Sequence, residues 1–186
     1  MHQLPKSRSE LENLFQQGTK FKYLFFWGHT QKSEDSIDAS CLSQWYPCSF
    51  SEDDIVYATA EHYMMAKKAE LFGDDAQKEA ILASSHPNEA KKLGRGVRDF
   101  DQTIWESHCL DIVTQANVAK FSQNLPLKQF LLQTEGRILV EASPVDKIWG
   151  IGLAKDDKRV QNPLQWKGKN LLGFALMHAR ETIKSI

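Results

Sequence analysis

The sequence predicts a mostly α-helical fold with a minor β component, in which helices pack orthogonally around one core beside a small β-sheet. A single domain is expected because the chain has 186 residues, of which 41% are hydrophobic. Apolar residues recur at helical spacing through the middle and end of the chain. No βαβ alternation or glycine-rich phosphate loop favours a doubly wound sheet. We expect a polar lead-in over residues 1–20 and the folded domain over residues 21–186.

The first elements are expected before residue 60. The polar start contains a short helix over Glu10–Gln16. The compact aromatic run Tyr23–Trp27 is typical of a buried strand, and Asp54–Tyr57 is a second short strand. Between the strands, His29–Ser40 is polar and acidic, which favours a loop.

Helices dominate from there on. Thr59 is placed to cap a helix that runs to about Phe72, where Gly73 provides the usual stop. Asp101 caps the longest helix, which runs to about Ser122. Two further helices are expected before it: one over Asp74–Ser84, and a short one opened by Ser85 and Pro87 and closed by Gly94. After it come a short helix over Pro126–Gln133 and a strand over Arg137–Ala142. Asn170 caps a final helix, whose inner face carries Leu172, Leu176, Ala179 and Ile183.

Charge and cysteine content exclude several classes of protein. With 23 basic and 24 acidic residues, the formal net charge is -1, which argues against binding nucleic acid or an anionic membrane through bulk charge. Cys41, Cys48 and Cys109 form no CxxC pair, so neither a disulfide framework nor a cysteine-based zinc site is expected. The start of the chain has no apolar signal region, and no run approaches membrane-spanning length. We expect a cytoplasmic protein without a membrane partner.

The first candidate for chemistry is an acid and an amine on one helical face. Glu61 lies in the first turn of the helix after Thr59, where the helix dipole favours an ionised carboxylate. Lys68 follows seven residues later on the same stripe, which otherwise holds Met65 and Phe72. Burying either charge unpaired is costly, so the pair needs an explanation, and a functional site is one. The alternative is a glutamate that assists the cap and a lysine whose charged end reaches solvent.

The second candidate is the turn after the last predicted strand. A proline, an acid, a tryptophan and two glycines follow one another closely over Ser143–Gly152. Trp149 beside Gly150 suits a flat base that stacks while the backbone approaches a ligand. Asp146 could bind sugar hydroxyls or act as a second carboxylate. The alternative is a surface turn with Trp149 folded onto the core.

Two basic clusters are candidates for binding an anion. One is Lys91–Arg95, and the other is Lys167–Asn170, just before the final helix. A helix N-terminus flanked by lysines can bind phosphate, although short basic clusters are most often solvated surface. The six histidines show no paired ligand spacing, so we expect no metal site.

Seven segments resemble motifs of the NADAR family, in the family's order and over about Phe25 to Arg180. They are Leu42–Phe50, Thr59–Ala69, Leu93–Arg95, Trp105–Glu106, Ala119–Phe121, Glu141–Gly152 and Asn170–Arg180. The resemblance implies hydrolysis of N-glycosidic bonds. Members release ribose 5-phosphate from early pyrimidine intermediates of riboflavin synthesis, namely 5-amino-6-(5-phosphoribosylamino)uracil and its diaminopyrimidine precursor, and others remove ADP-ribose from guanine in nucleic acid.

The resemblance also implies roles for individual residues. Glu61 would stabilise the oxocarbenium-like charge or act as general base, and Asp146 would hold ribose hydroxyls or assist proton transfer. Lys68 would attack the anomeric carbon or only pair with a carboxylate. The substrate-binding residues would be Trp105, Trp149, Gly150, Arg95, Lys169, Asn170 and Gln44, the last standing where the family usually has asparagine. Neither a metal nor an organic cofactor is expected.

Three functions remain open at this stage. One is hydrolysis of a small phosphoribosyl substrate, the second is hydrolysis of ADP-ribosyl groups on nucleic acid, and the third is a non-catalytic ADP-ribose-binding module. The acid and amine on one helical face favour an enzyme over a module. The near-neutral net charge favours the small substrate, because affinity for nucleic acid depends on neutralising phosphates. The sequence indicates no oligomeric state.

Overall fold

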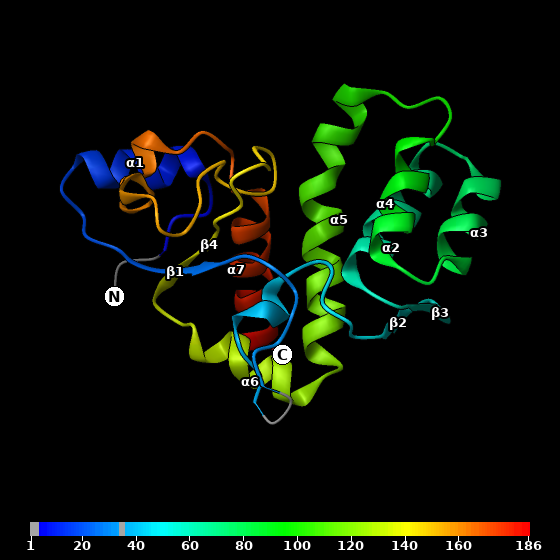
Figure 1. Cartoon of the computed structure of the whole chain (residues 1–186), viewed down its shortest axis with the longest axis horizontal. Coiled ribbons are helices and arrows are strands. Elements are labelled where there is room, and N and C mark those ends of the chain that lie inside the picture. The colour runs from blue at the N-terminus through cyan, green and yellow to red at the C-terminus, as the bar shows by residue number, and fades with distance from the viewer. Residues whose placement is uncertain (1–3, 34–35) are drawn as a thin grey trace.

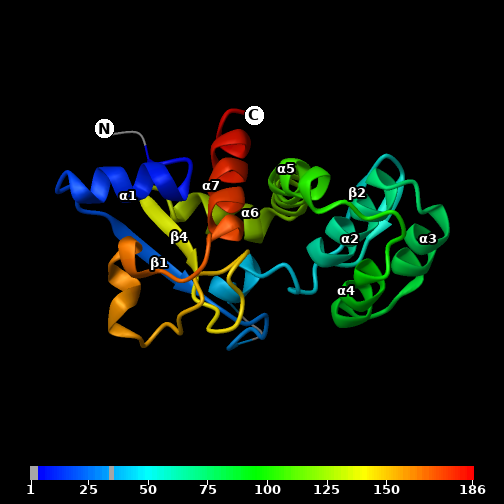
Figure 2. The same cartoon turned by 90° about the horizontal axis from the view of Figure 1, so that it is seen from above.

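A long helix, α5 (Gln102–Ser122), separates two lobes in the computed structural model, which describes residues 4–33 and 36–186 (Figures 1 and 2). One lobe contains α1 (Arg8–Gln16), β1 (Lys22–Phe26), α6 (Leu125–Gln133), β4 (Arg137–Glu141), α7 (Leu171–Lys184) and the 3-10 helices η1 (Ala39–Leu42), η2 (Lys158–Gln161) and η3 (Pro163–Gln165). The other contains β2 (Phe50–Glu52), β3 (Ile55–Tyr57), α2 (Ala60–Leu71), α3 (Asp75–Ala83) and α4 (Pro87–Arg95). The predicted mostly helical fold with little sheet is confirmed.

The core of the first lobe is a parallel pair of strands covered by α7. β1 pairs with β4 in the register Lys22 to Arg137 through Phe26 to Glu141. The three central residues of β4, Ile138–Val140, are fully buried, as is usual for a strand covered on both faces. One face of α7 is buried along its whole length and packs on β4. The lead-in joins this lobe, because Leu11 of α1 is fully buried and Arg8 donates to the carbonyl oxygens of Trp166 and Gly168.

The second sheet is a hairpin that the sequence revealed only in part. β2 and β3 are antiparallel and joined by Asp53 and Asp54, both with positive φ (50° and 62°), as a tight two-residue turn requires. The predicted strand over Asp54–Tyr57 therefore starts one residue later. Its partner Phe50–Glu52 was not predicted, since three residues carry too little alternation to be recognised.

The helix boundaries follow local signals except at Gly94. Thr59 caps α2 by accepting from the backbone N–H of His62 at 3.3 Å, and Gly73 follows with φ of 69°. Gly94 was predicted to end α4, but it lies inside the helix. A side chain there would overlap Met65 of α2. The glycine therefore allows α2 and α4 to approach closely.

Asn170 also differs from the prediction, because it does not cap α7 with its side chain. Its carboxamide instead bridges β4: Oδ1 accepts from the backbone N–H of Glu141 at 3.0 Å, and Nδ2 donates to the carbonyl of Leu139 at 2.9 Å. The residue is fully buried and has φ of 56°, a conformation that asparagine adopts more readily than most residues. Asn170 thus joins the end of β4 to the start of α7.

Within the described ranges, no helix is long and apolar enough to cross a membrane.

Gly173 is predicted to be intolerant of any side chain. A Cβ at this position would overlap the carbonyl oxygen of Leu139 and the side chain of Asn170. We expect Gly173→Ala to lower the free energy of unfolding by roughly 1–3 kcal/mol, as overpacking does. Urea unfolding measures the effect. Thr182→Ala, at an exposed position of the same helix, is the control, and equal stability of the two variants would contradict the prediction.

Candidate active site

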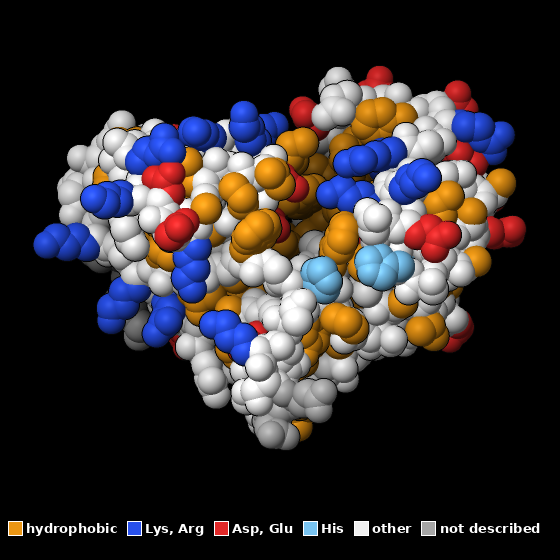
Figure 3. Space-filling view, viewed as in Figure 1, with side chains coloured by type: hydrophobic (Ala, Val, Ile, Leu, Met, Phe, Trp, Pro, Cys, Tyr) orange, Lys and Arg blue, Asp and Glu red, His pale blue; other side chains and the backbone are white. Residues whose placement is uncertain are grey.

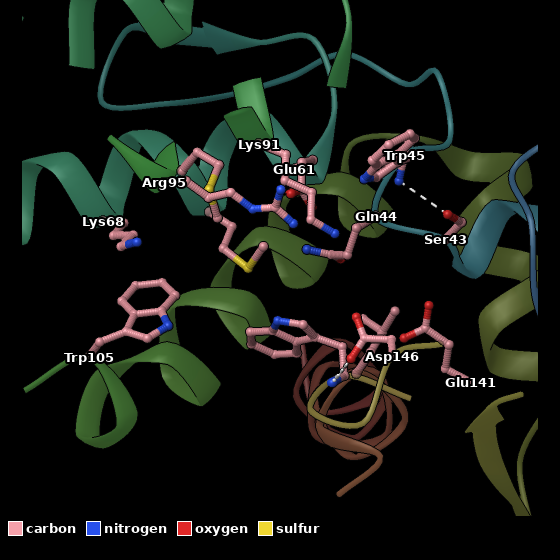
Figure 4. Close-up of a pocket in the computed structure, with 14 residues that line it drawn as sticks. Ser43, Gln44, Trp45, Glu61, Lys68, Lys91, Arg95, Trp105, Glu141 and Asp146 are labelled. Carbon is pink, nitrogen blue, oxygen red and sulfur yellow. Dashed lines mark hydrogen bonds between the residues drawn. The ribbon is translucent and has the colours of Figure 1, made fainter. Parts of the chain in front are cut away.

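A cavity of about 260 Å³ opens between the two lobes, and Figure 3 shows it as a hollow with Lys and Arg side chains along one rim. Figure 4 shows two facing walls, one carrying residues of α2, α4 and the segment after η1, the other carrying residues of α5 and of the connection from β4 to α7. Seven of the ten predicted site residues line this cavity: Gln44, Glu61, Lys68, Arg95, Trp105, Asp146 and Trp149. Sequence segments far apart in the chain therefore meet here as predicted.

Glu61 is buried in the cavity wall with little to compensate its charge. Its side chain is 3% exposed, and Oε1 has no hydrogen-bond partner in the described part of the chain. Burial raises the pKa of Glu61 to about 7, and nearby Asp146 adds to the shift, whereas Lys91, the Trp45 indole and Arg95 oppose it. Glu61 can therefore take up or release a proton near neutral pH, as a general acid or base must.

Asp146 is held in place by its own loop. Its Oδ1 accepts hydrogen bonds from the backbone N–H groups of Ile148 and Trp149, both at 2.8 Å. These bonds orient the backbone of Trp149, so that one residue both places a carboxyl group at the cavity and supports one of its walls.

Lys68 lies at the side of the cavity formed by Trp105. Its Nζ donates to the carbonyl of Gly94 at 2.8 Å and lies 4.1 Å from the centre of the Phe100 ring and 5.7 Å from that of Trp105. Burial, together with the charge of Arg95, lowers the pKa of Lys68. An amine with a lowered pKa is more often neutral, which a nucleophilic role requires.

Lys67 points away from the cavity, although it is adjacent in sequence. Its Nζ lies 3.3 Å from Glu52 and 3.5 Å from Glu70. Burial lowers its pKa, but the charge of Glu70 and further contacts outweigh this, and the net shift is upward. The two lysines therefore differ in surroundings, and Lys68 alone of the pair lines the cavity.

Glu141, the last residue of β4, is a third carboxyl group in the cavity that the sequence interpretation did not assign to the site. Its Oε2 is buried and has no partner among the residues described. Burial raises the pKa of Glu141 to about 8, the charges of Asp146 and Glu61 add to the shift, and Lys91 opposes it. The loop that follows folds back over the end of the strand, where the backbone N–H of Ile151 donates to the carbonyl of Glu141 at 2.9 Å.

The segment Ser43–Trp45 adds a polar donor and a third indole. Gln44 accepts from Asn117 Nδ2 at 3.0 Å through Oε1, and its buried Nε2 has no partner in the ranges described. Trp45, which the prediction missed, lines the cavity beside Lys91, whose Nζ is 5.8 Å from the indole centre. Lys91 and Arg95 lie one turn apart on α4 and both face the cavity, so the first of the two basic clusters is in place for an anion.

The backbone donors of the second basic cluster are occupied within the chain. The backbone N–H groups of Lys169, Asn170, Leu171 and Leu172 donate to the carbonyl oxygens of Lys147, Gly150, Ile148 and Trp149. The first-turn donors that would bind a phosphate are therefore occupied by the preceding loop. Neither Lys169 nor Asn170 lines the cavity: the Lys169 side chain is 57% exposed beside Glu106, and Asn170 is buried.

Gly150, predicted as a substrate contact, packs against its own loop. A Cβ on Gly150 would press against the carbonyl oxygens of Glu141 and Asp146. The glycine allows the loop to fold closely on itself rather than on a ligand, and it does not line the cavity.

No group of three histidine, cysteine or acidic side chains close enough to hold a metal ion occurs in residues 4–33 and 36–186.

A family model for the NADAR domain matches residues 25–184. The chain belongs to the NADAR family. It is 46% identical to the N-glycosidase R617 of Acanthamoeba polyphaga mimivirus, over 86% of this chain and 95% of that protein. It is 33% identical to the N-glycosidase YbiA of Escherichia coli, over 81% of this chain and 84% of that protein. The NADAR chain also shares 36% identity with the riboflavin biosynthesis protein PYRR of Zea mays, over 70% of this chain but 20% of that longer protein.

The fold agrees with an experimental structure from the same family. The NMR structure of E. coli YbiA superposes with a TM-score of 0.71 and 26% identity, and the match covers 98% of this chain and 94% of that one. The prediction of an enzyme of the N-glycosidase class is confirmed by these relatives.

The Glu61 carboxyl is predicted to make the folded NADAR protein less stable as the pH rises. Its pKa is raised from 4.5 to about 7 on folding, so the unfolded chain releases this proton first and the free energy of unfolding falls between these values. Glu61→Gln removes the ionisation and should be more stable than the natural protein by roughly 1–3 kcal/mol at about pH 8. The advantage should vanish near pH 4.5.

Thermal unfolding at both pH values measures this difference. Exposed Glu79→Gln is the matched control, because it makes the same chemical change at the surface. A gain for Glu61→Gln that is equal at both pH values would contradict the assigned cause.

Proposed function

We propose that this NADAR protein hydrolyses the N-glycosidic bond of a phosphoribosylamino-pyrimidine, such as 5-amino-6-(5-phosphoribosylamino)uracil, and releases ribose 5-phosphate. The observation that carries the proposal is the combination within one cavity of buried carboxyl groups, indole rings and two cations on adjacent turns of α4. Each part of such a substrate has a counterpart: the anomeric carbon meets carboxylates, the flat base meets indoles, and the phosphate meets Lys91 and Arg95.

The chemistry requires these groups for separate reasons. Cleavage at the anomeric carbon builds positive charge on the sugar ring, which an ionised carboxylate stabilises. Glu61 lies on the wall that also carries Lys91 and Arg95, so a phosphate bound by these cations would place the ribose beside it. Trp105 and Trp149 would bound the base on the facing wall, and Asp146 would hold ribose hydroxyls.

The size of the cavity and the net charge of the chain favour a small substrate. A volume of about 260 Å³ lies just below the range of roughly 300–1,000 Å³ of pockets that enclose small molecules, which favours a substrate with a single-ring base over a larger one. The net charge of -1 provides no general attraction for nucleic acid. The maize relative, named a riboflavin biosynthesis protein, is consistent with this substrate class.

A second candidate is removal of ADP-ribose from guanine in nucleic acid. The observation that favours it is a group of aromatic rings around Trp45. The ring centre of Trp45 lies 5.7 Å from that of His29 and 6.1 Å from that of His86. Together with Lys91 these rings could hold the part of a larger substrate that extends beyond the cavity.

Turnover of two substrates tests the proposal. The natural protein should release ribose 5-phosphate from the phosphoribosylamino-pyrimidine faster than it releases ADP-ribose from an ADP-ribosylated guanine oligonucleotide, as measured by chromatography of the products. Glu61→Gln should lower kcat by about two to four orders of magnitude because a charge-stabilising or basic group is lost. Glu79→Gln should retain full activity. The reverse substrate preference would favour the second candidate, and unchanged turnover of folded Glu61→Gln would remove Glu61 from the mechanism.

We also propose that Lys68 attacks the sugar. Its amine forms a bond to the anomeric carbon, and the electron pair of the broken carbon–nitrogen bond leaves with the base, which takes up a proton. Opening of the ring by protonation of its oxygen then gives an imine, and water releases the sugar and restores the amine. The lowered pKa of Lys68, caused by burial and by Arg95, supports this role.

Borohydride trapping tests the nucleophile. Reduction during turnover should inactivate the enzyme and add a ribosyl-derived mass to the peptide that contains Lys68. Lys68→Arg keeps the charge but cannot form the imine, so labelling and turnover should both be lost. Lys67→Arg is the matched control, because Lys67 faces Glu52 and Glu70, and it should behave like the natural enzyme. If Lys68→Arg keeps much of its rate and the natural enzyme gives no adduct, Lys68 is not the nucleophile.

A further inference from the structure

Three carboxyl groups from separate elements converge on the cavity: Glu61 from α2, Glu141 from the end of β4, and Asp146 from the loop that follows. Figure 4 shows Glu141 beside Asp146 on one side and Glu61 across from them. Three carboxylates in one partly desolvated cavity repel each other, so the cluster binds at least one proton near neutral pH. The location of that proton decides which group can act as an acid.

The surroundings distinguish the three groups. Asp146 accepts hydrogen bonds from two backbone N–H groups at 2.8 Å, so its Oδ1 is already partnered within its own loop. Glu61 is stabilised in its ionised form by Lys91, by the Trp45 indole and by Arg95.

Glu141 has less to stabilise its charge. Of the cations, only Lys91 favours ionisation of its carboxyl, whereas Asp146 and Glu61 both oppose it. Its Oε2 is buried without a partner in the part of the chain described. Among the three, Glu141 is therefore the group on which the shared proton rests, and its side chain lines the cavity with one carboxyl oxygen unpartnered in the part of the chain described.

We propose that Glu141 is the general acid that protonates the nitrogen of the leaving base. This inference rests on the proposed N-glycosidase reaction and assigns a catalytic role that is needed whether water or Lys68 attacks the sugar. As the bond between the anomeric carbon and nitrogen breaks, its electron pair passes to the nitrogen, which takes the proton from Glu141. The attacking nucleophile releases a proton to Glu61 in the same cavity. Glu61 passes this proton on to the Glu141 carboxylate, which restores the acid.

The leaving group explains why an acid is needed. An amino-pyrimidine that leaves without a proton would carry a full negative charge on its exocyclic nitrogen, which is a poor leaving group. A pyridinium base such as nicotinamide departs as a neutral molecule and needs no proton. A group that acts only as proton donor therefore matters for the first type of substrate and not for the second.

Comparison of two substrates tests this role. On the phosphoribosylamino-pyrimidine, Glu141→Gln should lower kcat by roughly 10²–10⁴-fold with little change in KM, because glutamine cannot donate the proton as an acid. On nicotinamide mononucleotide, which carries the same ribose 5-phosphate, it should retain activity within a few-fold. Glu61→Gln should slow both substrates, since charge at the sugar develops in either reaction. Equal loss on both substrates, or no loss on the first, would overturn the assignment.

The pH profile gives a second, independent readout. Around Glu141 the charged groups that face it are Asp146, Glu61 and Lys91, and its proton is lost as the pH rises through about 8. The natural enzyme's kcat on the amino-pyrimidine should therefore fall above this pH, and the residual activity of Glu141→Gln should lack this decline. The same decline in Glu141→Gln would assign it to another group and overturn the proposal.

Failure of the proposed function itself would look different. In that case the natural enzyme would not cleave the phosphoribosylamino-pyrimidine at all. If nicotinamide mononucleotide proves not to be a substrate, the pH profile alone decides the role of Glu141. Thermal unfolding of Glu141→Gln, expected to be no less stable than the natural protein above pH 7 because a buried ionisable group is removed, checks that lost activity does not reflect lost folding.

Discussion

The side-chain amide of Asn170 is the contact on which one wall of the active site depends. It accepts from the backbone of Glu141 and donates to the carbonyl of Leu139, so it ties the end of β4 to the start of α7. The loop that follows β4 is then fixed by four backbone hydrogen bonds from residues 169–172, the last two residues before α7 and the first two of the helix. Because Asp146 and Trp149 lie in this loop, a single buried asparagine sets the positions of two carboxyl groups and an indole. Gly173 leaves the space this contact requires.

The opposite wall depends on a buried cation. Lys120 of α5 is fully buried and donates to the carbonyl oxygens of Cys41 and Ser43 at 2.7 and 2.9 Å, and burial lowers its pKa to about 8. With Asn117, which holds Gln44, it fixes the segment that brings Gln44 to the cavity. An ammonium group is costly to bury, and the two hydrogen bonds from Lys120 offset part of that cost while they order the end of η1 and the turn that follows it.

Local signals predicted most helices, because caps and apolar stripes are encoded within a few residues, as Thr59 and Asp101 show. Pairing between distant segments was not predictable: nothing near β1 indicates that β4 is its parallel partner. The same limit applies to the site. Glu61 and Lys68 could be identified from one helix, whereas Glu141 could not, since its burial depends on a loop that folds back. Asn170 satisfied the pattern of a helix cap, but tertiary contacts use its side chain elsewhere.

The two glutamates also show how function opposes stability in this fold. A buried carboxyl with one unpartnered oxygen is unfavourable in the free protein, and Glu61 and Glu141 both have one. An apolar residue at either position would suit the wall better, as Met64 and Met65 do nearby. Gln44 Nε2 is a third unpartnered polar group at the same cavity. A polar ligand that supplies partners for this donor and for the two carboxyl oxygens would explain all three unpaired groups at once. The groups that weaken the empty protein are then the same groups that bind and act on the substrate.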